Sequence, residues 1–234
     1  MAQTILITRP REDAEKLAAD LEAQGFDTLI EPMLHIDFLK DPGFSAAGAQ
    51  AILLTSANGA RALGRTGAPR DIRVLAVGTK TADAARAAGF RNVETAGGNV
   101  AELARLAGRI LDPESGPAIH VSGRDVVGDL AGALSAQGFT YRRHVLYKAR
   151  AAEVLGEAAR AALASGAIAG VVFYSARTAA TFVMLVKQAG LAATLRALTA
   201  YCLSEAVATA ARDAAWARVE ISAGPADRGQ KSAD

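Results

Sequence analysis

Two stretches of the sequence place small polar residues directly after an apolar run. Residues 51–63 read AILLTSANGARAL and residues 170–185 read GVVFYSARTAATFVML, so that Ser175 falls 119 residues after Ser56. An apolar run that ends in a serine and is followed by helical spacing predicts a strand, a tight turn and a helix. Such a turn leaves backbone N–H groups free at the helix N-terminus, which favours the binding of an anion.

The same pattern of an apolar strand and a polar turn recurs elsewhere in the chain. Residues 78–81 (GTKT), 122–125 (SGRD) and 204–205 (SE) each follow an apolar run. Strands that alternate with helices are typical of a parallel sheet, whose carboxyl ends lie at one edge and commonly bind ligands there. Each hydroxyl in these turns can instead serve only as the cap of the helix that follows, and this alternative stays open.

The composition indicates a globular protein and argues against nucleic-acid binding. Of the 234 residues, 51% are apolar and 21% are charged, the formal net charge is +2, and no basic cluster is longer than Arg142-Arg143. A protein that neutralises many phosphates needs more positive charge than this. No stretch approaches the roughly 20 apolar residues of a membrane helix, and residues 1–7 lack the pattern of a signal peptide, so we expect a cytoplasmic protein without membrane contact.

The cysteine and the histidines predict neither redox nor metal chemistry. Cys202 is the single cysteine of the sequence and lies in an apolar context, which predicts a buried, unreactive thiol. His35, His120 and His144 do not have the spacing of metal ligands, and His120 lies inside an apolar strand. We therefore expect structural roles for all three histidines and no bound metal.

Long-range repeats predict how the chain is organised. Ser56 and Ser175 mark one repeated unit, and residues 93–96 and 219–222 mark another at an offset of 126. With the first segment, three kinds of unit are each used twice in the order A-B-C-A′-B′-C′, which predicts two similar α/β domains. Five residues of the first helical segment recur 113 residues later, namely Leu17, Leu21, Gln24, Gly25 and Phe26 as Leu130, Leu134, Gln137, Gly138 and Phe139.

Local signals predict further elements between these turns. Proline lacks the N–H that a central strand needs, and stretches without periodicity read as connectors. The sequence therefore predicts a strand at 28–34 interrupted by Pro32, connectors at 37–50 and near 148–152, a strand at 118–121 that ends before Ser122, and a helix at 153–164.

Six motifs, in this order, resemble the uroporphyrinogen-III synthase family of tetrapyrrole biosynthesis: ILITRP, LLTSANGA, LAVGTKTA, VLYKA, FYSARTA and CLSEAVA. The resemblance covers nearly the whole chain. It implies an α/β fold of two flavodoxin-like domains with parallel sheets, joined by a two-stranded connector. The first domain would be discontinuous, formed by 1–36 plus 151–234, and the second would be 37–150. Repeat arithmetic alone would divide the chain into two contiguous halves, so this crossed division comes from the resemblance.

The resemblance also implies a reaction and its partners. The substrate would be hydroxymethylbilane, a small linear tetrapyrrole with eight carboxylates, which loses water and closes to uroporphyrinogen III with inversion of ring D in a cleft between the domains. The substrate reacts through its own pyrroles, so no cofactor is needed and the enzyme chiefly positions the chain. We expect a monomer that contacts the preceding enzyme of the pathway only transiently.

The site residues follow from matching these motifs. Tyr147 matches the family tyrosine near the interdomain strands, and a phenol can donate a proton to a departing hydroxyl; a tyrosine in an alternating strand can equally be half-buried packing. Hydroxyls, backbone N–H groups and arginines at the strand ends would hold the carboxylates. The predicted substrate-binding residues are Arg9, Ser56, Asn58, Gly78, Thr81, Ser122, Gly123, Arg124, Ser175, Arg177 and Ser204.

Two departures from the family pattern affect these expectations. Residues 204–207 read SEAV where many members carry Gly and paired Thr, so hydroxyl donors are missing. Residues 224–234 read as a polar, disordered tail where the family usually has a closing helix. A non-enzymatic two-domain binding or sensory protein for a small anionic ligand would have the same turns and is the rival interpretation. A nucleotide-dependent enzyme is disfavoured because GTKT lacks the Gly-Lys-Thr of a P-loop.

Overall fold

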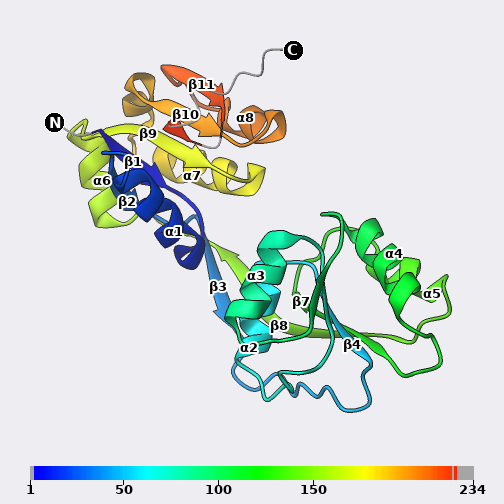
Figure 1. Cartoon of the computed structure of the whole chain (residues 1–234). Helices are drawn as coiled ribbons and strands as arrows, with labels where there is room; N and C mark the ends of the chain where they lie inside the picture. Colours follow the sequence, from blue (N-terminus) through cyan, green and yellow to red (C-terminus); the bar gives the residue numbers. More distant parts are fainter. Residues whose placement is uncertain (1–2, 223, 226–234) are drawn as a thin grey trace. The chain divides into compact units, whose positions relative to one another are not determined.

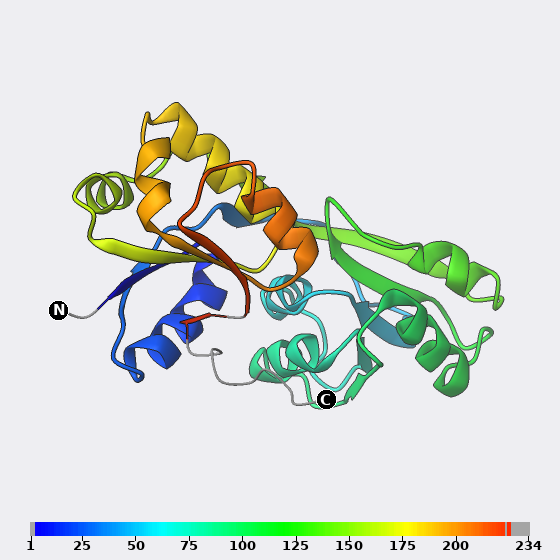
Figure 2. The same ribbon diagram turned by 90° about the horizontal axis from the view of Figure 1, so that it is seen from above.

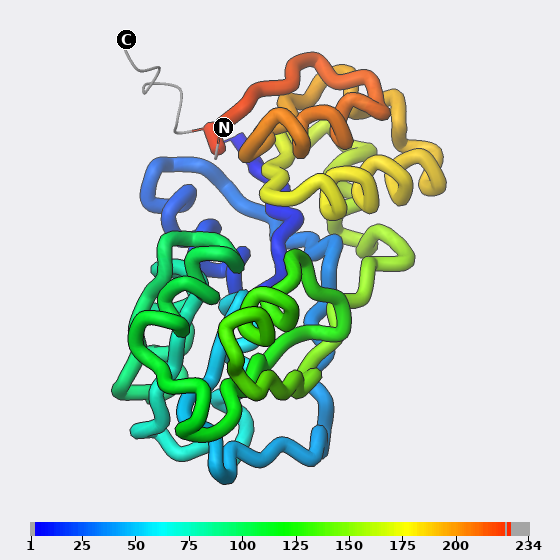
Figure 3. Tube along the Cα trace, turned by 90° about the vertical axis from the view of Figure 1, so that its right-hand side faces the viewer, coloured from blue at the N-terminus to red at the C-terminus, as the bar shows by residue number. Residues whose placement is uncertain are grey.

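The chain forms two compact units. The structure, a computed structural model, describes residues 3–222 and 224–225. Unit 1 consists of Met1–His35 and Arg150–Asp234, and unit 2 consists of Ile36–Ala149. Figure 3 shows the two distant parts of unit 1, in blue and in yellow to red, lying together, while unit 2 is the cyan and green part. Of the predicted disordered tail at 224–234, Gly224 and Pro225 are described and are buried, and residues 226–234 lie outside the described residues.

Unit 1 is a parallel sheet with helices on both faces. Ile5 and Ile7 pack against one helix, while Leu6 and Phe173 pack into the opposite layer. Figure 2 shows α1 on one side of this sheet and α7 and α8 on the other. The strand order is β11 (Arg218–Ile221), β10 (Thr199–Cys202), β9 (Ile168–Phe173), β1 (Thr4–Ile7) and β2 (Asp27–Ile30), and the helices are α1 (Arg11–Glu22), α6 (Glu157–Ala164), α7 (Ala176–Gln188) and α8 (Glu205–Ala211), with a 3-10 helix η1 (Ala192–Ala197).

Unit 2 repeats this arrangement with one added strand. Ile52 and Leu54 face the layer of α2 and α3, and Leu53 faces the layer of α4 and α5, which lie on opposite sides of the sheet in Figure 1. Both faces are covered, so β4 is apolar at every position. The strand order is β3 (Leu34–Phe38), β8 (Tyr141–Ala151), β7 (Ala118–Gly123), β4 (Ala51–Leu54), β5 (Val74–Ala76) and β6 (Val93–Thr95), and the helices are α2 (Ala57–Gly64), α3 (Thr79–Ala87), α4 (Val100–Ile110) and α5 (Leu130–Ser135).

The two sheets have the same strand order and different chain connections. In unit 1 the order β2-β1-β9-β10-β11 follows the flavodoxin-like 2-1-3-4-5 pattern directly. In unit 2 the order β8-β7-β4-β5-β6 is the same pattern. Here β7 and β8 take the places of the first and second strands, although they come after β4, β5 and β6 in the chain. The chain passes between the units in β3 and in β8, which are neighbours in the second sheet. The predicted fold class, α/β with two largely parallel sheets, is confirmed.

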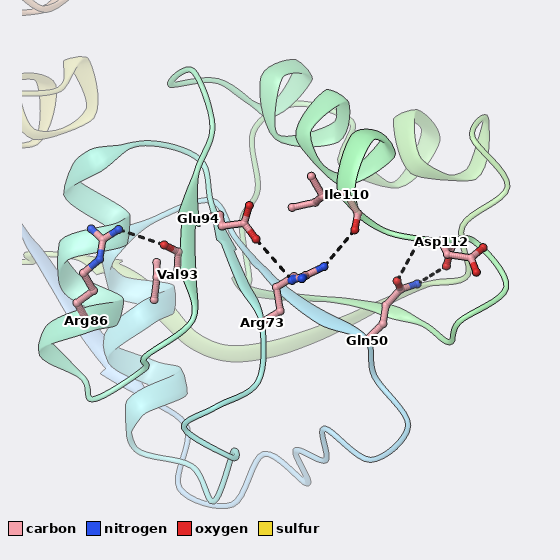
Figure 4. Close-up of polar contacts among 7 residues, drawn as sticks. All are labelled: Gln50, Arg73, Arg86, Val93, Glu94, Ile110 and Asp112. Atoms are coloured by element: carbon pink, nitrogen blue, oxygen red, sulfur yellow. Dashed lines mark hydrogen bonds and ion pairs between the residues drawn. The ribbon is translucent and has the colours of Figure 1, made fainter.

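Polar contacts close the amino ends of the strands in unit 2 (Figure 4). Arg73, just before β5, donates from Nη1 to the carbonyl of Ile110 at 3.1 Å and pairs with Glu94. Gln50, just before β4, exchanges hydrogen bonds with the backbone of Asp112 in both directions. These contacts bind the end of α4 to the sheet, so the amino edge is occupied by the protein itself. The carboxyl edge is where the helix N-termini point.

Several predicted elements were wrong in their bounds. The stretch 28–34 contains β2 and the start of β3, which are separated around Pro32, and β3 runs into the predicted connector at 37–50. The second connector is also a strand, because β8 continues to Ala151. The helix expected from 153 begins at Glu157, after Gly156, whose N–H donates to Glu31 at 2.6 Å. The strand expected to end before Ser122 continues to Gly123, because that residue pairs with Tyr147.

Candidate functional site

The strand-end serines cap the helices that follow them. Ser56 Oγ accepts a hydrogen bond from the N–H of Gly59 at 3.0 Å, and Ser175 Oγ accepts one from Thr178 at 3.2 Å. Ser204 occupies the same position before α8 and makes no side-chain cap bond. A cap bond satisfies one N–H of the first turn and leaves the others directed beyond the strand. The capping alternative is therefore real for Ser56 and Ser175, and it is compatible with anion binding by the remaining N–H groups.

Ser56 makes a second contact that Ser175 does not make. Its Oγ lies 2.8 Å from the phenol oxygen of Tyr147, which comes from β8 on the far side of β7. The Tyr147 side chain is 8% exposed and packs with Leu63 and Leu146 in the layer under α2. Tyr147 is thus both a packed core residue and a hydrogen-bonding partner of the turn.

Gly123 sets the position of the Tyr147 ring. A Cβ at residue 123 would lie 2.8 Å from two carbons of that ring, which is closer than side-chain carbons approach. The pairing of β7 with β8 shifts register between Ser122 and Gly123, so that Gly123 lies opposite Tyr147. The backbone N–H of Arg124 then donates to the carbonyl of Tyr147 at 3.0 Å. The bulge and the glycine together place the phenol against Ser56.

A cavity of about 620 Å³ opens at this edge of unit 2. Its lining contains both polar and aliphatic side chains, and the aliphatic Val127 is 91% exposed. A volume of this size is in the range of sites for small organic ligands. The lining residues of polar type or glycine are Thr55, Ser56, Gly98, Asn99, Gly123, Asp125, Gly128 and Tyr147, and the apolar ones are Val77, Val100, Ala101, Val126 and Val127.

Arg143 fastens the wall of this cavity and was missed from the sequence. Its Nε donates to Ser122 Oγ at 2.8 Å, and its Nη2 donates to the carbonyls of Gly123 and Arg124 at 2.7 and 2.6 Å. Ser122 is 1% exposed, and its hydroxyl also donates to the Gly123 carbonyl. Ser122 is therefore occupied within the protein, and Arg143 brings a positive charge to the turn. Strand alternation gave no signal for this role, because it depends on the partner strand.

The other predicted binding residues fall into separate groups. In unit 2, Gly78 is the extended residue before α3, Thr81 is 5% exposed inside that helix, and Asn58 accepts a hydrogen bond from Arg61 at 2.6 Å. Ser56, Gly123 and Tyr147 line the cavity together, whereas Asn58, Gly78, Thr81, Ser122 and Arg124 lie near strand ends outside its lining.

The predicted residues of unit 1 lie around the ends of β1, β9 and β10. Arg9 pairs with Asp13 at 2.7 Å, and its guanidinium lies 4.2 Å from the centre of the Tyr174 ring. The charge of Arg9 is thus balanced inside its own turn. Arg177, in the first turn of α7, is exposed, as is Ser204.

The buried histidine and cysteine remain neutral. Burial, with a smaller contribution from Arg143, lowers the pKa of His120 to about 4. Burial raises the pKa of Cys202 to about 11, so its predicted burial as a neutral thiol is confirmed. Among the residues that the structure describes, no group of three or more His, Cys, Asp and Glu side chains is arranged to hold a metal, and no helix is long and apolar enough to cross a membrane.

Comparison with known proteins relates this chain to one family. A family model described as uroporphyrinogen-III synthase HemD matches residues 15–229. A sequence comparison with curated proteins gave no match.

Two solved structures share the fold at low sequence identity. A uroporphyrinogen-III synthetase from Helicobacter pylori is 12% identical, with a TM-score of 0.60, over 95% of this chain and 94% of that one. A mutant uroporphyrinogen III synthase from Thermus thermophilus is 21% identical, with a TM-score of 0.54, over 94% of this chain and 92% of that one.

Proposed function

The chain belongs to the uroporphyrinogen-III synthase family, and we propose that Tyr147 in unit 2 supplies the proton that its reaction needs. As a member of this family the protein is a cyclising lyase. It converts hydroxymethylbilane into uroporphyrinogen III, with loss of water and inversion of ring D. Membership of the family disfavours the rival interpretation of a non-enzymatic binding or sensory protein.

The hydrogen bond between Tyr147 and Ser56 is the observation that carries the proposal. Breaking the carbon–oxygen bond of the hydroxymethyl group releases hydroxide unless a proton is donated as the bond breaks, and a phenol at the cavity can donate it. The phenolate that remains is stabilised by Ser56, whose hydroxyl can rotate to donate to it. The N–H of Gly59 at the start of α2 holds Ser56 in place for this purpose.

The proton balance closes within the reaction. The electrophilic methylene left by water is attacked by the carbon of ring D that already carries a methylene bridge. That bridge bond then breaks and re-forms at the free carbon of the same ring, which inverts ring D, and the ring regains its aromaticity by losing the proton of that carbon. The phenolate of Tyr147 can take up this proton, which returns the enzyme to its starting state. The net change is the loss of one water molecule, with no oxidation or reduction.

The carboxylates of the substrate are held by strand-end turns in both units. The N-termini of α2, α3, α7 and α8 follow these turns and support this proposal, since helix N-termini attract anions. The residues assigned to this role are Arg9, Ser56, Asn58, Gly78, Thr81, Gly123, Arg124, Ser175, Arg177 and Ser204. For Ser122 the burial of the hydroxyl favours a role in positioning the turn through Arg143.

The proposed domains and assembly follow from the two units. The domains are residues 1–36 with 151–234, and residues 37–150, a division supported by unit bounds that differ from it by one residue. Each unit has its own buried core, so neither needs a second copy of the chain to bury its apolar residues, which supports a monomer. We further propose that the monomer acts in the cytoplasm and contacts the preceding enzyme only transiently. Sedimentation of the purified protein tests the monomer.

Product analysis tests the function itself. Hydroxymethylbilane, made enzymatically, is supplied to the purified protein, and the type I and type III products are separated by chromatography. We expect type III as the main product, against type I in the reaction without protein. Type I alone, formed at the spontaneous rate, would contradict the proposal and favour the binding protein.

A further inference from the structure

A chain of three side chains joins the interior of unit 2 to the cavity. The phenol of Tyr141, at the start of β8, lies 2.7 Å from Nδ1 of His120, and Nε2 of His120 lies 3.0 Å from Oγ1 of Thr55. His120 is 2% exposed, in the middle of β7, and its backbone lies between Leu53 on one neighbouring strand and Arg143 on the other. Thr55 lines the cavity. The proposed mechanism does not use any member of this chain.

Thr55 and Ser56 are contacted from opposite faces of the sheet. Tyr147 packs in the layer of α2 and α3, whereas Tyr141 packs against the layer of α4 and α5. Successive residues at the end of a strand point to opposite faces of the sheet. The imidazole of His120 therefore contacts Thr55 on one face, and the phenol of Tyr147 contacts Ser56 on the other. The turn after β4 is therefore held by two independent polar contacts, and both reach the cavity.

The chemistry of the three groups sets the direction of the hydrogen bonds. A phenol is more acidic than an alcohol, so Tyr141 is the better donor of the two oxygens, and Thr55 is the better acceptor. A neutral imidazole accepts at one nitrogen and donates at the other, and its tautomer is fixed by the partner at each. Tyr141 then donates to Nδ1, and Nε2–H donates to Oγ1 of Thr55. The low pKa of His120, caused mainly by burial, agrees with a neutral ring.

We propose that Tyr141 and His120 are positioning residues that turn the hydroxyl hydrogen of Thr55 toward the cavity, making Thr55 a second hydrogen-bond donor to the substrate. The inference rests on the proposed function, because it assigns the cavity to the tetrapyrrole. In the described part of the chain Thr55 Oγ1 has no hydrogen-bond partner besides His120. Its hydrogen is thus available to a carboxylate or to the departing hydroxyl, and a donor fixed before the substrate binds needs no reorganisation.

The tautomer of His120 is the first test, and it does not depend on activity. The sequence has 3 histidines, so long-range proton–nitrogen NMR spectra can be assigned with His35→Gln and His144→Gln variants. We expect Nε2 protonated and Nδ1 unprotonated in the wild-type protein near neutral pH. In Tyr141→Phe the Nδ1 partner is lost, and we expect the spectrum to shift toward a mixture of tautomers. A wild-type ring protonated at Nδ1 would overturn the proposal.

Kinetics provides the second test, with matched variants of the same residue. Thr55→Val keeps the shape and removes the hydroxyl, and we expect it to lower kcat/KM by about 3- to 10-fold, the effect of one hydrogen bond. Thr55→Ser keeps the hydroxyl and should stay within about twofold of the wild type. Tyr141→Phe should lower kcat/KM by about 2- to 5-fold, and the double variant should be no worse than Thr55→Val alone, since both changes remove one donor.

The outcomes separate this inference from the proposed function. If the wild type makes only the type I product, the proposed function fails while the tautomer is still decided by NMR. If the wild type makes type III and Thr55→Val keeps full kcat/KM, Thr55 is not a donor to the substrate and the inference is overturned. If Thr55→Val folds, additive losses of kcat/KM in the double variant would overturn the inference. If Thr55→Val does not fold, Tyr141→Phe decides, and an unchanged kcat/KM in that variant would overturn the inference.

Discussion

The turn after β4 in unit 2 and the turn after β9 in unit 1 share a sequence pattern but differ in what surrounds their serines. Both serines cap a helix through their own Oγ. Ser56 also contacts Tyr147 from another strand, whereas the second contact of Ser175 is Thr178, three residues further along the same chain segment. The strand-turn-helix pattern therefore supplies backbone donors in both units, and in unit 2 the strand β8, two positions away from β4 in the sheet, adds the phenol of Tyr147 beside the serine.

The two units also share a glycine pressed against a tyrosine ring. In unit 2 a Cβ at Gly123 would lie 2.8 Å from carbons of the Tyr147 ring, and in unit 1 a Cβ at Gly170 would lie 2.7 Å from a carbon of the Tyr201 ring. Tyr201 belongs to the buried core of β10 and is not assigned a catalytic role. Under the proposed mechanism, the packing of a glycine against a tyrosine ring serves the chemistry in unit 2 and stability in unit 1, and substitutions can separate the two uses.

The largest expected effect is that of removing the phenol of Tyr147. Tyr147→Phe should lower kcat by about 10²- to 10⁴-fold, the usual range for general acid assistance, with little change in KM. Tyr174→Phe is the matched control, because Tyr174 precedes Ser175 as Thr55 precedes Ser56, and we expect it to keep its rate. Steady-state kinetics with separation of the two product isomers measures both. A Tyr147→Phe enzyme with full turnover would remove the acid role.

The next effect comes from the paired glycines. Gly123→Ala should displace the Tyr147 ring and lower kcat by about 10²-fold, because a small misplacement of a reacting group is costly. Gly170→Ala should lower the free energy of unfolding by about 1 to 3 kcal/mol through overpacking and leave kcat per folded molecule unchanged. Urea unfolding and active-site kinetics on both variants make the comparison. Equal losses of kcat in the two would show that the rate follows general packing and not the position of Tyr147.

Replacing each of the two serines by alanine should give a smaller difference in kcat between the units. Ser56→Ala and Ser175→Ala each lose a cap bond, so each should cost about 0.5 to 2 kcal/mol of stability. Only Ser56→Ala also removes the partner of Tyr147, and we expect it to lower kcat by about tenfold, the effect of roughly one hydrogen bond in the transition state. Ser175→Ala should change kcat by less than about twofold, since the backbone N–H donors of this turn remain in place. If Ser175→Ala lowered kcat as much, the difference between the units would disappear.

How far the sequence predicts this site depends on the distance between the residues involved. The turn at Ser56 could be predicted because the apolar run, the cap and the helical spacing are all local signals. The contact of Ser56 with Tyr147 joins residues 91 apart and depends on a register shift after Ser122, which strand alternation does not encode. The resemblance indicated Tyr147, but its partner and the part of Gly123 in placing the ring came only from the structure.

The crossed connection of the two sheets could not be predicted from the sequence repeats, for a similar reason. Repeats indicate which segments are alike, and they do not indicate which like segment pairs with which. β1 pairs with β9, whose residues lie more than 160 positions later in the chain, and β7 pairs with β4. Both pairings are set by how buried apolar strands assemble in space. The contacts of Arg143 and Thr55 escaped prediction too, because their partners lie on adjacent strands.

The smallest expected effect concerns the buried titratable groups, which differ between the units in the direction of their pH dependence. In unit 2 the pKa of His120 is about 4 in the folded protein and near its ordinary 6.5 in the unfolded chain. The unfolded chain therefore binds the extra proton first, and stability falls as the pH decreases through 6.5 toward 4. In unit 1 the raised pKa of Cys202, about 11 against 9.0, makes stability fall as the pH rises above about 9.

Between about pH 7.5 and about pH 6, the His120 contribution to this loss amounts to about 0.8 kcal/mol. Urea unfolding at a series of pH values measures it, and the His120→Gln variant is the control, because it cannot take up the proton and its stability should change less over this interval. Cys202→Ala should keep the wild-type slope on the acid side and lose part of the fall on the alkaline side. Wild-type and His120→Gln proteins with the same slope between about pH 7.5 and 6 would mean that His120 is accessible to protons in the folded state, contrary to its closed hydrogen bonds to Thr55 and Tyr141.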